Sequence, residues 1–225
     1  MVKIDLSLSE IIGTGPGDAL VVVDMQNDFM PGGALPVPGG DEIVPGVNAM
    51  IRMFSHADRL VVLTQDWHPP GHRSFASAHA GRQPYDPHEE PGIGPVLWPD
   101  HCVQGTHGAA FHRDLLTSHA QAIIRKGCRI TMDSYSGFLE NDRTTTTGLD
   151  GYLRDRKVGR VFICGLALDY CAFFTASDAL DLGYEVVFIL DLARPVGSPP
   201  DSASRALRTL ESKNVRFVRS DAVRY

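Results

Sequence analysis

The chain has 225 residues, of which 43% are hydrophobic and 21% charged, and its formal net charge is −6. These values are ordinary for a globular protein, and the acidic balance argues against a broad nucleic-acid-binding surface. No apolar run reaches the roughly 18 residues that a membrane helix needs, and residues 1–18 lack the charged-then-apolar pattern of a signal sequence. We therefore expect a cytoplasmic protein that binds neither nucleic acid nor membranes, folded as a single domain over residues 1–225.

Six short apolar runs, most of them continuous and rich in Val and Ile, are typical of strands buried on both faces. They are Ala19–Val23, Leu60–Thr64, Ala120–Arg125, Arg160–Cys164, Glu185–Leu190 and Val215–Val218. Helical periodicity occurs over Glu42–His56, Asp169–Leu182 and Ser202–Ser212. This alternation of strands and helices predicts an α/β protein whose βαβ units form a parallel sheet covered on both faces.

Residues 65–118 differ from the rest of the chain, because they are rich in His, Pro and Gly and show little periodicity. A loop of this length inside a compact domain is usually functional or disordered. The aromatic residues scattered through it argue against disorder, so we expect a functional loop region, and its Asp and His residues make it the candidate region for binding a metal and a substrate. The polar segment "RTTTTGLDG" at 143–151 is expected to be an exposed loop.

Polar residues follow four of the predicted strands where each strand ends. Asp24 follows the first, Gln65–His68 the second, Lys126 the third and Gly165–Cys171 the fourth. Ligands of open α/β sheets bind beyond the carboxyl ends of the strands. A carboxylate, a candidate metal motif, an amine and a thiol are therefore expected to converge on one rim.

Cys171 lies in "VFICGLALDYCAFF", which is typical of a strand, a glycine-led turn and the start of a helix. A helix N-terminus lowers the pKa of a thiol, and the N–H groups of such a turn can form an oxyanion hole. The alternative is a buried structural cysteine, as we expect for Cys164, while Asp169 is predicted to cap the helix. The four cysteines include no CxxC pair, so we expect free thiols rather than a zinc ribbon.

A cysteine nucleophile needs a base, and Asp24 and Lys126 are the candidates at the neighbouring strand ends. Asp24 can take the thiol proton if burial raises its pKa, and Lys126 can balance the charge. The alternatives are a loop cap for Asp24 and a solvent-exposed lysine for Lys126. Asp28 is expected to hold the following loop by hydrogen bonds.

The motif "TQDWHPPGH" places Asp66 and His68 on the same side of an extended chain. His101, in "LWPDHC", can supply a third ligand from the far end of the loop region. Two histidines and one carboxylate suit one divalent transition metal ion, whether Zn, Fe or Mn. His72 is the candidate for a fourth ligand or for a residue that supports the ligands. The nearby aromatic residues Phe29, Trp67, Trp98 and Tyr135 are candidates either for core packing or for the walls of an aromatic substrate site.

Five motifs in this order resemble the nicotinamidases of the isochorismatase-like cysteine hydrolase superfamily. They are "VVVDMQNDFMPGGALPVPGG", "LTQDWHPPGHRSFAS", "LWPDHCVQGT", "IRKG" with "DSYSGF", and "GLALDYC". The resemblance extends over roughly residues 19–195. It implies a three-layer α/β/α fold with a six-stranded parallel sheet.

The resemblance also implies roles for particular residues. It places the catalytic triad on Asp24, Lys126 and Cys171, and the metal ligands on Asp66, His68 and His101. It also implies an oxyanion hole formed by the N–H groups of Ala167 and Cys171, with a cis peptide at Leu166–Ala167. The implied substrate pocket consists of Phe29, Trp98, Tyr135 and Leu166. The implied reaction is metal-dependent hydrolysis of nicotinamide, an aromatic carboxamide, to nicotinate and ammonia through a thioester. Pyrazinamide is the second expected substrate, and a homo-oligomer is expected.

Two segments depart from the family pattern. Leu168 stands where "GLATDYC"-type turns have Thr, and "DLARPVGSPP" replaces the commoner "DACRGV" segment. Both departures concern fine specificity rather than the triad or the ligands. The alternative functions are an amide or ureido hydrolysis by another member of the superfamily, and ligand binding without catalysis.

Overall fold

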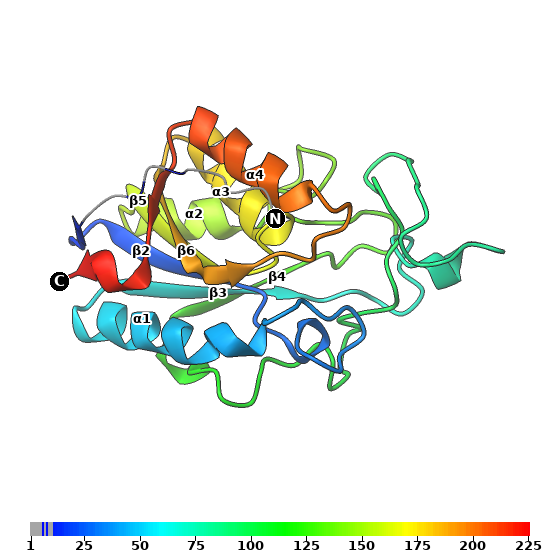
Figure 1. Cartoon of the computed structure of the whole chain (residues 1–225), viewed down its shortest axis with the longest axis horizontal. Helices are drawn as coiled ribbons and strands as arrows, with labels where there is room; N and C mark the ends of the chain where they lie inside the picture. The colour runs from blue at the N-terminus through cyan, green and yellow to red at the C-terminus, as the bar shows by residue number, and fades with distance from the viewer. Residues whose placement is uncertain (1–5, 7, 9–10) are drawn as a thin grey trace.

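A six-stranded parallel sheet forms the centre of the computed structural model, which describes residues 6, 8 and 11–225 (Figure 1). In spatial order its strands are β4 (Ala122–Lys126), β3 (Leu60–Asp66), β2 (Asp18–Val23), β5 (Arg160–Leu166), β6 (Glu185–Arg194) and β7 (Arg216–Val218). All six predicted runs are strands of this sheet, and every neighbouring pair is parallel. Residues 1–5, 7, 9 and 10, on which the prediction about a signal sequence partly rests, lie outside the described residues.

The apolar runs are continuous where a strand is covered on both faces. All six residues of β2, a central strand, are buried. The edge strand β4 instead alternates between half-buried and exposed positions before the buried Lys126, and Ile123 is 47% exposed. The expectation of burial on both faces is therefore wrong for β4, because the face that carries Ile123 and Arg125 is left uncovered at this edge of the sheet.

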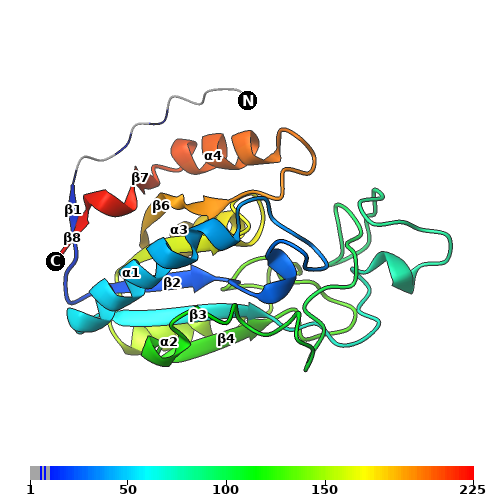
Figure 2. The ribbon, with the colours of Figure 1, turned by 60° about the horizontal axis from the view of Figure 1, so that its bottom comes forward.

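Helices cover both faces of the sheet and give three layers (Figures 1 and 2). One face carries α1 (Val44–His56), and the other carries α2 (Leu149–Asp155) and α3 (Cys171–Asp181), with α4 (Ser202–Ser212) packed against α3. The fold prediction is thus confirmed. The prediction of a loop at 143–151 is wrong at its end, because α2 begins at Leu149 and buries Leu149 and Leu153 against the core.

Short elements complete the described fold. The 3-10 helices are Asn27–Phe29, Asp41–Ile43, Ala76–Ala78, Thr117–His119 and Ser220–Ala222, and β1 (Ile12–Gly13) pairs with β8 (Val223–Arg224). The chain between β3 and β4 extends beyond the carboxyl ends of the strands (Figure 1), as the composition of residues 65–118 predicts. Among the described residues, no helix combines the length and apolarity required to cross a bilayer.

The sheet register fixes where the polar strand ends lie. Asp66 pairs with Lys126 across β3 and β4, and Val23 pairs with Gly165 across β2 and β5. The backbones approach so closely at the second pair that a Cβ on Gly165 would lie 2.2 Å from the carbonyl oxygen of Val23. Asp24 directly follows Val23, so the ends of four adjacent strands meet at one level.

Candidate active site

Asp24, Lys126 and Cys171 meet at this edge of the sheet. Lys126 Nζ lies 2.9 Å from Asp24 Oδ2 and 3.4 Å from Cys171 Sγ. All three residues are buried, with exposed fractions of 0%, 1% and 6%. Cys171 is the first residue of α3, and Asp24 leaves β2 with a φ of 46°, a value that is uncommon for a residue other than glycine. The backbone therefore turns at the carboxylate and directs it toward the amine and the thiol.

Neighbouring groups hold the carboxylate and the ammonium in place. Thr64 Oγ1 donates to Asp24 Oδ1 at 2.6 Å and accepts the Asp24 N–H at 3.2 Å. Lys126 Nζ also donates to the carbonyl of Ser134 at 2.9 Å and to Asp66 Oδ1. The surface alternative for Lys126 is wrong, because its ammonium is fully enclosed by acceptors.

Burial controls the protonation of the three groups. Burial raises the pKa of the Cys171 thiol well above its usual value, although the charge of Lys126 opposes this. The pKa of this thiol is therefore raised overall, opposite to the lowered pKa expected for a thiol at a helix N-terminus. Burial likewise raises the pKa of Asp24 against the opposing effect of Lys126, while the two carboxylates outweigh burial and raise the pKa of Lys126 well above its usual value. The resting thiol is protonated, beside a carboxylate with increased proton affinity.

Asp66, His68 and His101 form a second group next to the first. Asp66 Oδ2 lies 3.6 Å from His68 Nε2 and 3.8 Å from His101 Nε2. His68 Nδ1 lies 3.0 Å from the carbonyl of Gly127, and His101 Nδ1 lies 2.8 Å from that of Pro99. A carbonyl accepts only from an N–H, so both rings carry hydrogen on Nδ1 and present Nε2 to Asp66, as metal-ligating histidines do. The donor set and its spacing fit one divalent transition metal ion, because ligands about 2.1 Å from an ion lie roughly 3.4 Å apart in a tetrahedral site.

The side chain of Gln26 holds the backbone of Asp66 in place. Gln26 Oε1 accepts the N–H of Asp66 and Gln26 Nε2 donates to its carbonyl, both at 2.8 Å.

Burial alone would raise the pKa of Asp66, but the charges of Lys126 and His68 hold it well below the usual range. Burial alone would lower the pKa of His68, but the carboxylates of Asp66 and Asp133 raise it. The site therefore attracts positive charge.

His72 lies beside His68, with ring centroids 4.5 Å apart. Its Nδ1 lies 2.7 Å from Ser74 Oγ, and its Nε2 lies 3.1 Å from the carbonyl of Met132. Burial and the neighbouring His68 lower its pKa. Both ring nitrogens have partners in the protein, so the geometry supports packing of His72 against a ligand rather than direct ligation.

A narrow cavity joins the two groups. It is lined by Asp66, His101 and Cys171, by the aromatic residues Phe29, Trp98, Tyr135 and Tyr170, and by Leu35, Asp133, Ala167 and Val196. Its free volume for the centres of water molecules is about 20 Å³, which is room for one or two waters at roughly 10–15 Å³ each. Leu166 is not among the lining residues; its fully buried side chain packs toward Gly40. Trp67 lies outside the lining as well, against the guanidinium of Arg125.

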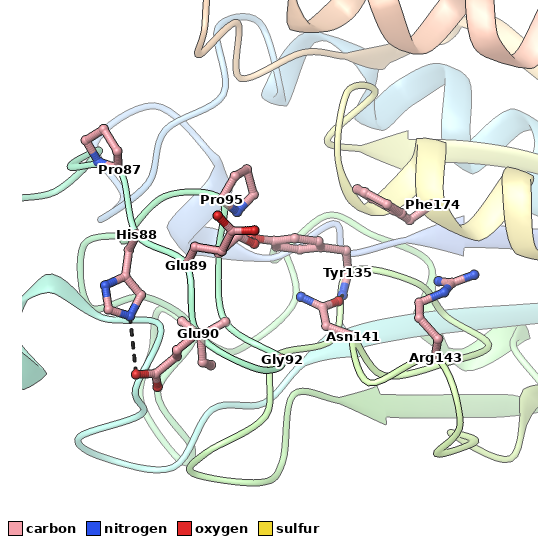
Figure 3. A pocket seen from close by; sticks show the side chains of 12 residues that line it. Pro87, His88, Glu89, Glu90, Gly92, Pro95, Tyr135, Asn141, Arg143 and Phe174 are labelled. Carbon is pink, nitrogen blue, oxygen red and sulfur yellow. Dashed lines mark hydrogen bonds and ion pairs between the residues drawn. The ribbon is translucent and has the colours of Figure 1, made fainter.

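A second, outer cavity of about 560 Å³ adjoins the first (Figure 3). Tyr135 lines both, and the residues around the outer one include Glu89, Gly94, Arg143 and Phe174. Tyr135 Oη donates to the carbonyl of Gly94 at 2.7 Å and accepts from Trp98 Nε1 at 3.1 Å. Tyr135 thus lies between the two cavities, held by these two hydrogen bonds.

The turn before Cys171 contains the cis peptide Leu166–Ala167 that the resemblance implies. Ala167 and Cys171 line the cavity, and among the described residues no acceptor takes the N–H of either one. The predicted cap role of Asp169 is wrong. Its carboxylate accepts from the N–H groups of Val196 and Gly197, both at 2.9 Å, and from Ser202, so it joins this turn to the loop before α4.

The fold and the site define a parallel α/β protein with a buried cysteine beside a Lys–carboxylate pair and a candidate metal site. Residues 18–221 match the family model described as "Isochorismatase domain", and the chain therefore belongs to the isochorismatase family.

Relatives within this family agree with the resemblance to nicotinamidases. The nicotinamidase of Acinetobacter baylyi is 48% identical over 178 residues, 79% of this chain and 81% of that protein. The structure titled as a nicotinamidase and pyrazinamidase of Acinetobacter baumannii is 44% identical, with a TM-score of 0.87 over 92% of this chain and 98% of that one. The pyrazinamidase of Pyrococcus horikoshii, in complex with zinc, is 43% identical, with a TM-score of 0.75 over 91% of this chain and 99% of that one.

Sequence reasoning missed three residues that support the site. Thr64 lies near the end of an apolar strand and Gln26 lies three residues after β2, and each is a polar residue one or two positions from a predicted site residue. Asp133 is the first residue of "DSYSGF", in which Tyr135 is the one predicted site residue. A polar side chain within two residues of a predicted site residue was the available signal in each case.

Proposed function

We propose that the protein hydrolyses nicotinamide to nicotinate and ammonia, and pyrazinamide to pyrazinoate, through a thioester on Cys171. The observation that carries the proposal is the contact of Lys126 with Asp24 and Cys171 beside a buried cavity, which Cys171 lines together with two of the candidate metal ligands, Asp66 and His101. The family membership and the similarity to nicotinamidases support the substrate class.

In the first half of the reaction, Asp24 takes the thiol proton and Cys171 Sγ attacks the carboxamide carbon. The N–H groups of Ala167 and Cys171 donate to the oxyanion that forms. Asp24 then gives its proton to the departing nitrogen, the C–N bond breaks, and ammonia leaves behind a thioester. The raised pKa of Asp24 supports this role, since a carboxylate with a normal pKa would be a weak base for a buried thiol.

In the second half, Asp24 takes a proton from a water molecule, whose oxygen attacks the thioester carbon. The C–S bond breaks and releases nicotinic acid, which gives its proton to solvent to become nicotinate, while the proton on Asp24 returns to Cys171 Sγ. Lys126 stays in contact with Asp24 and near the sulfur, where it balances the negative charge that moves between them.

Asp66, His68 and His101 would hold one divalent transition metal ion, which when bound supplies a Lewis-acidic site for the pyridine nitrogen and so orients the ring. The choice among zinc, iron and manganese stays a prediction. Zinc is supported by the ion of the Pyrococcus horikoshii pyrazinamidase. The rings of Phe29, Trp98, Tyr135 and Tyr170 would enclose the substrate.

The single domain over residues 1–225, the cytoplasmic location, the absence of nucleic-acid and membrane partners and the homo-oligomeric state stay predictions. The substrate we propose as the partner is a small aromatic carboxamide.

Replacing Cys171 with Ala tests the covalent mechanism. Ammonia release from nicotinamide should fall to background, while the circular-dichroism spectrum and the bound metal stay unchanged. The matched control is Cys128→Ala, because Cys128 is an exposed free thiol outside the cavity and should retain full activity. Ammonia release at the wild-type rate by Cys171→Ala would refute the thioester.

A further inference from the structure

Asp133 is a buried carboxylate that the proposed reaction does not use. It is 3% exposed and lines the cavity together with Asp66 and His101. Its Oδ1 accepts the N–H of Ser134 at 2.8 Å. Among residues 6, 8 and 11–225, this is its one side-chain hydrogen bond, and no Lys, Arg or His nitrogen lies within 4.0 Å of its oxygens. A buried charge in such surroundings is costly unless an opposite charge compensates it.

The bond to Ser134 does not explain the charge. An asparagine could accept the same N–H through its amide oxygen, without placing a negative charge inside the protein. The aspartate is therefore more than a turn-forming residue, and its free oxygen needs a partner within the cavity.

The buried ammonium of this site already has carboxylate partners, and the neighbouring histidines are candidate ligands. The ammonium of Lys126 contacts Asp24 and Asp66. Ligand atoms of Asp133, His68 and His72 lie within 4.8 Å of one another, and this group shares His68 with the candidate metal group. Three buried carboxylates, of Asp24, Asp66 and Asp133, thus lie near one buried ammonium, that of Lys126. A divalent ion bound at Asp66, His68 and His101 would supply the positive charge that Asp133 lacks.

We propose that Asp133 is a positioning residue of the metal site, whose negative charge beside His68 increases the affinity for a divalent transition metal ion without direct ligation. This inference rests on the metal site of the proposed function. Residues that support metal ligands change metal affinity by about 10- to 100-fold when they are replaced. We expect a loss of that size when the charge of Asp133 is removed.

The test compares zinc affinities of metal-loaded wild type and Asp133→Asn, measured by competition with a chromophoric chelator at fixed pH and salt. Asp133→Asn keeps the acceptor for the Ser134 N–H, so a merely structural role predicts unchanged affinity. The proposal predicts a dissociation constant raised about 10-fold or more. Glu89→Gln is the matched control, because it removes one negative charge from an exposed residue of the adjoining outer cavity and should leave the affinity unchanged.

An affinity of Asp133→Asn within about 2-fold of wild type overturns the proposal. If that variant does not fold, Asp133→Glu and Asp133→Gln are compared, since they have equal length and differ in charge. Equal zinc affinity of these two also overturns it. The readout is independent of catalysis: a wild type that binds zinc but releases no ammonia would contradict the proposed reaction and leave the affinity comparison valid.

Discussion

Thr64→Val isolates the hydrogen bond that supports the proposed base. Valine keeps the shape of the side chain and removes the hydroxyl that donates to Asp24 Oδ1 at 2.6 Å and accepts the Asp24 N–H. A hydrogen bond to a charged group contributes about 1.5–3 kcal/mol. If that amount is lost from the transition state, kcat/KM falls by roughly 10- to 100-fold.

The same change has a defined effect on the pH profile. The bond from Thr64 lowers the pKa of Asp24, although burial keeps that pKa above its usual value overall. Without the bond the pKa rises further, so Asp24 is protonated up to a higher pH and is lost as a base there. The acidic limb of kcat/KM, which reports the free enzyme, should therefore move to higher pH.

The assay is ammonia release from nicotinamide at several pH values, for wild type, Thr64→Val and the control Thr175→Val. Thr175 is also buried, and its hydroxyl accepts the N–H of Gly137 without touching Asp24. The control should lose stability but keep the position of the acidic limb. The role assigned to Asp24 is refuted if the limb of Thr64→Val stays in place or moves to lower pH.

Three further changes test other contacts. Lys126→Met leaves two buried carboxylates without their cation and should lower the free energy of unfolding by about 3–5 kcal/mol in urea denaturation; an unfolding curve identical to wild type would contradict the buried ion pairs. His101→Ala removes a candidate ligand, so the metal content measured by elemental analysis should fall below one ion per chain, and an unchanged content would contradict the assignment. Asp169→Ala removes three hydrogen bonds to the loop before α4 and to its first residue, Ser202, and should cost roughly 2–4 kcal/mol in the same denaturation assay; a change under about 0.5 kcal/mol would show that these bonds are not needed.

The strand ends were predictable because each apolar run stops at a polar residue and parallel strands present their carboxyl ends at one edge. That reasoning located Asp24 and Lys126 without knowledge of their contacts. It could not establish that Lys126 is buried, since burial depends on Asp66 and Ser134 meeting its ammonium from other segments. Pairwise contacts between distant segments leave no periodic signal in the sequence.

Asp169 is a second residue whose contacts with distant segments could not be predicted from the sequence. An aspartate just before a helix is a good candidate for an N-cap, and local reasoning favoured that role. The loop before α4 offers the Asp169 carboxylate two N–H groups, and Ser202 at the start of α4 offers a hydroxyl, so these distant donors replace the local bond. The resemblance placed Leu166 in the substrate pocket, but its side chain is fully buried and packs toward Gly40, and only the course of the backbone could decide this.

The close approach of Gly165 to Val23 has a consequence for tolerance to mutation. Gly165 has a φ of 112°, and any Cβ there would meet the backbone of β2 one residue before Asp24. A substitution would have to push apart the two central strands, and the base would move with the end of β2. In a saturation scan scored by activity, Gly165 should therefore behave like a catalytic position although it contributes no functional group, and a library aimed at new substrates should leave it fixed.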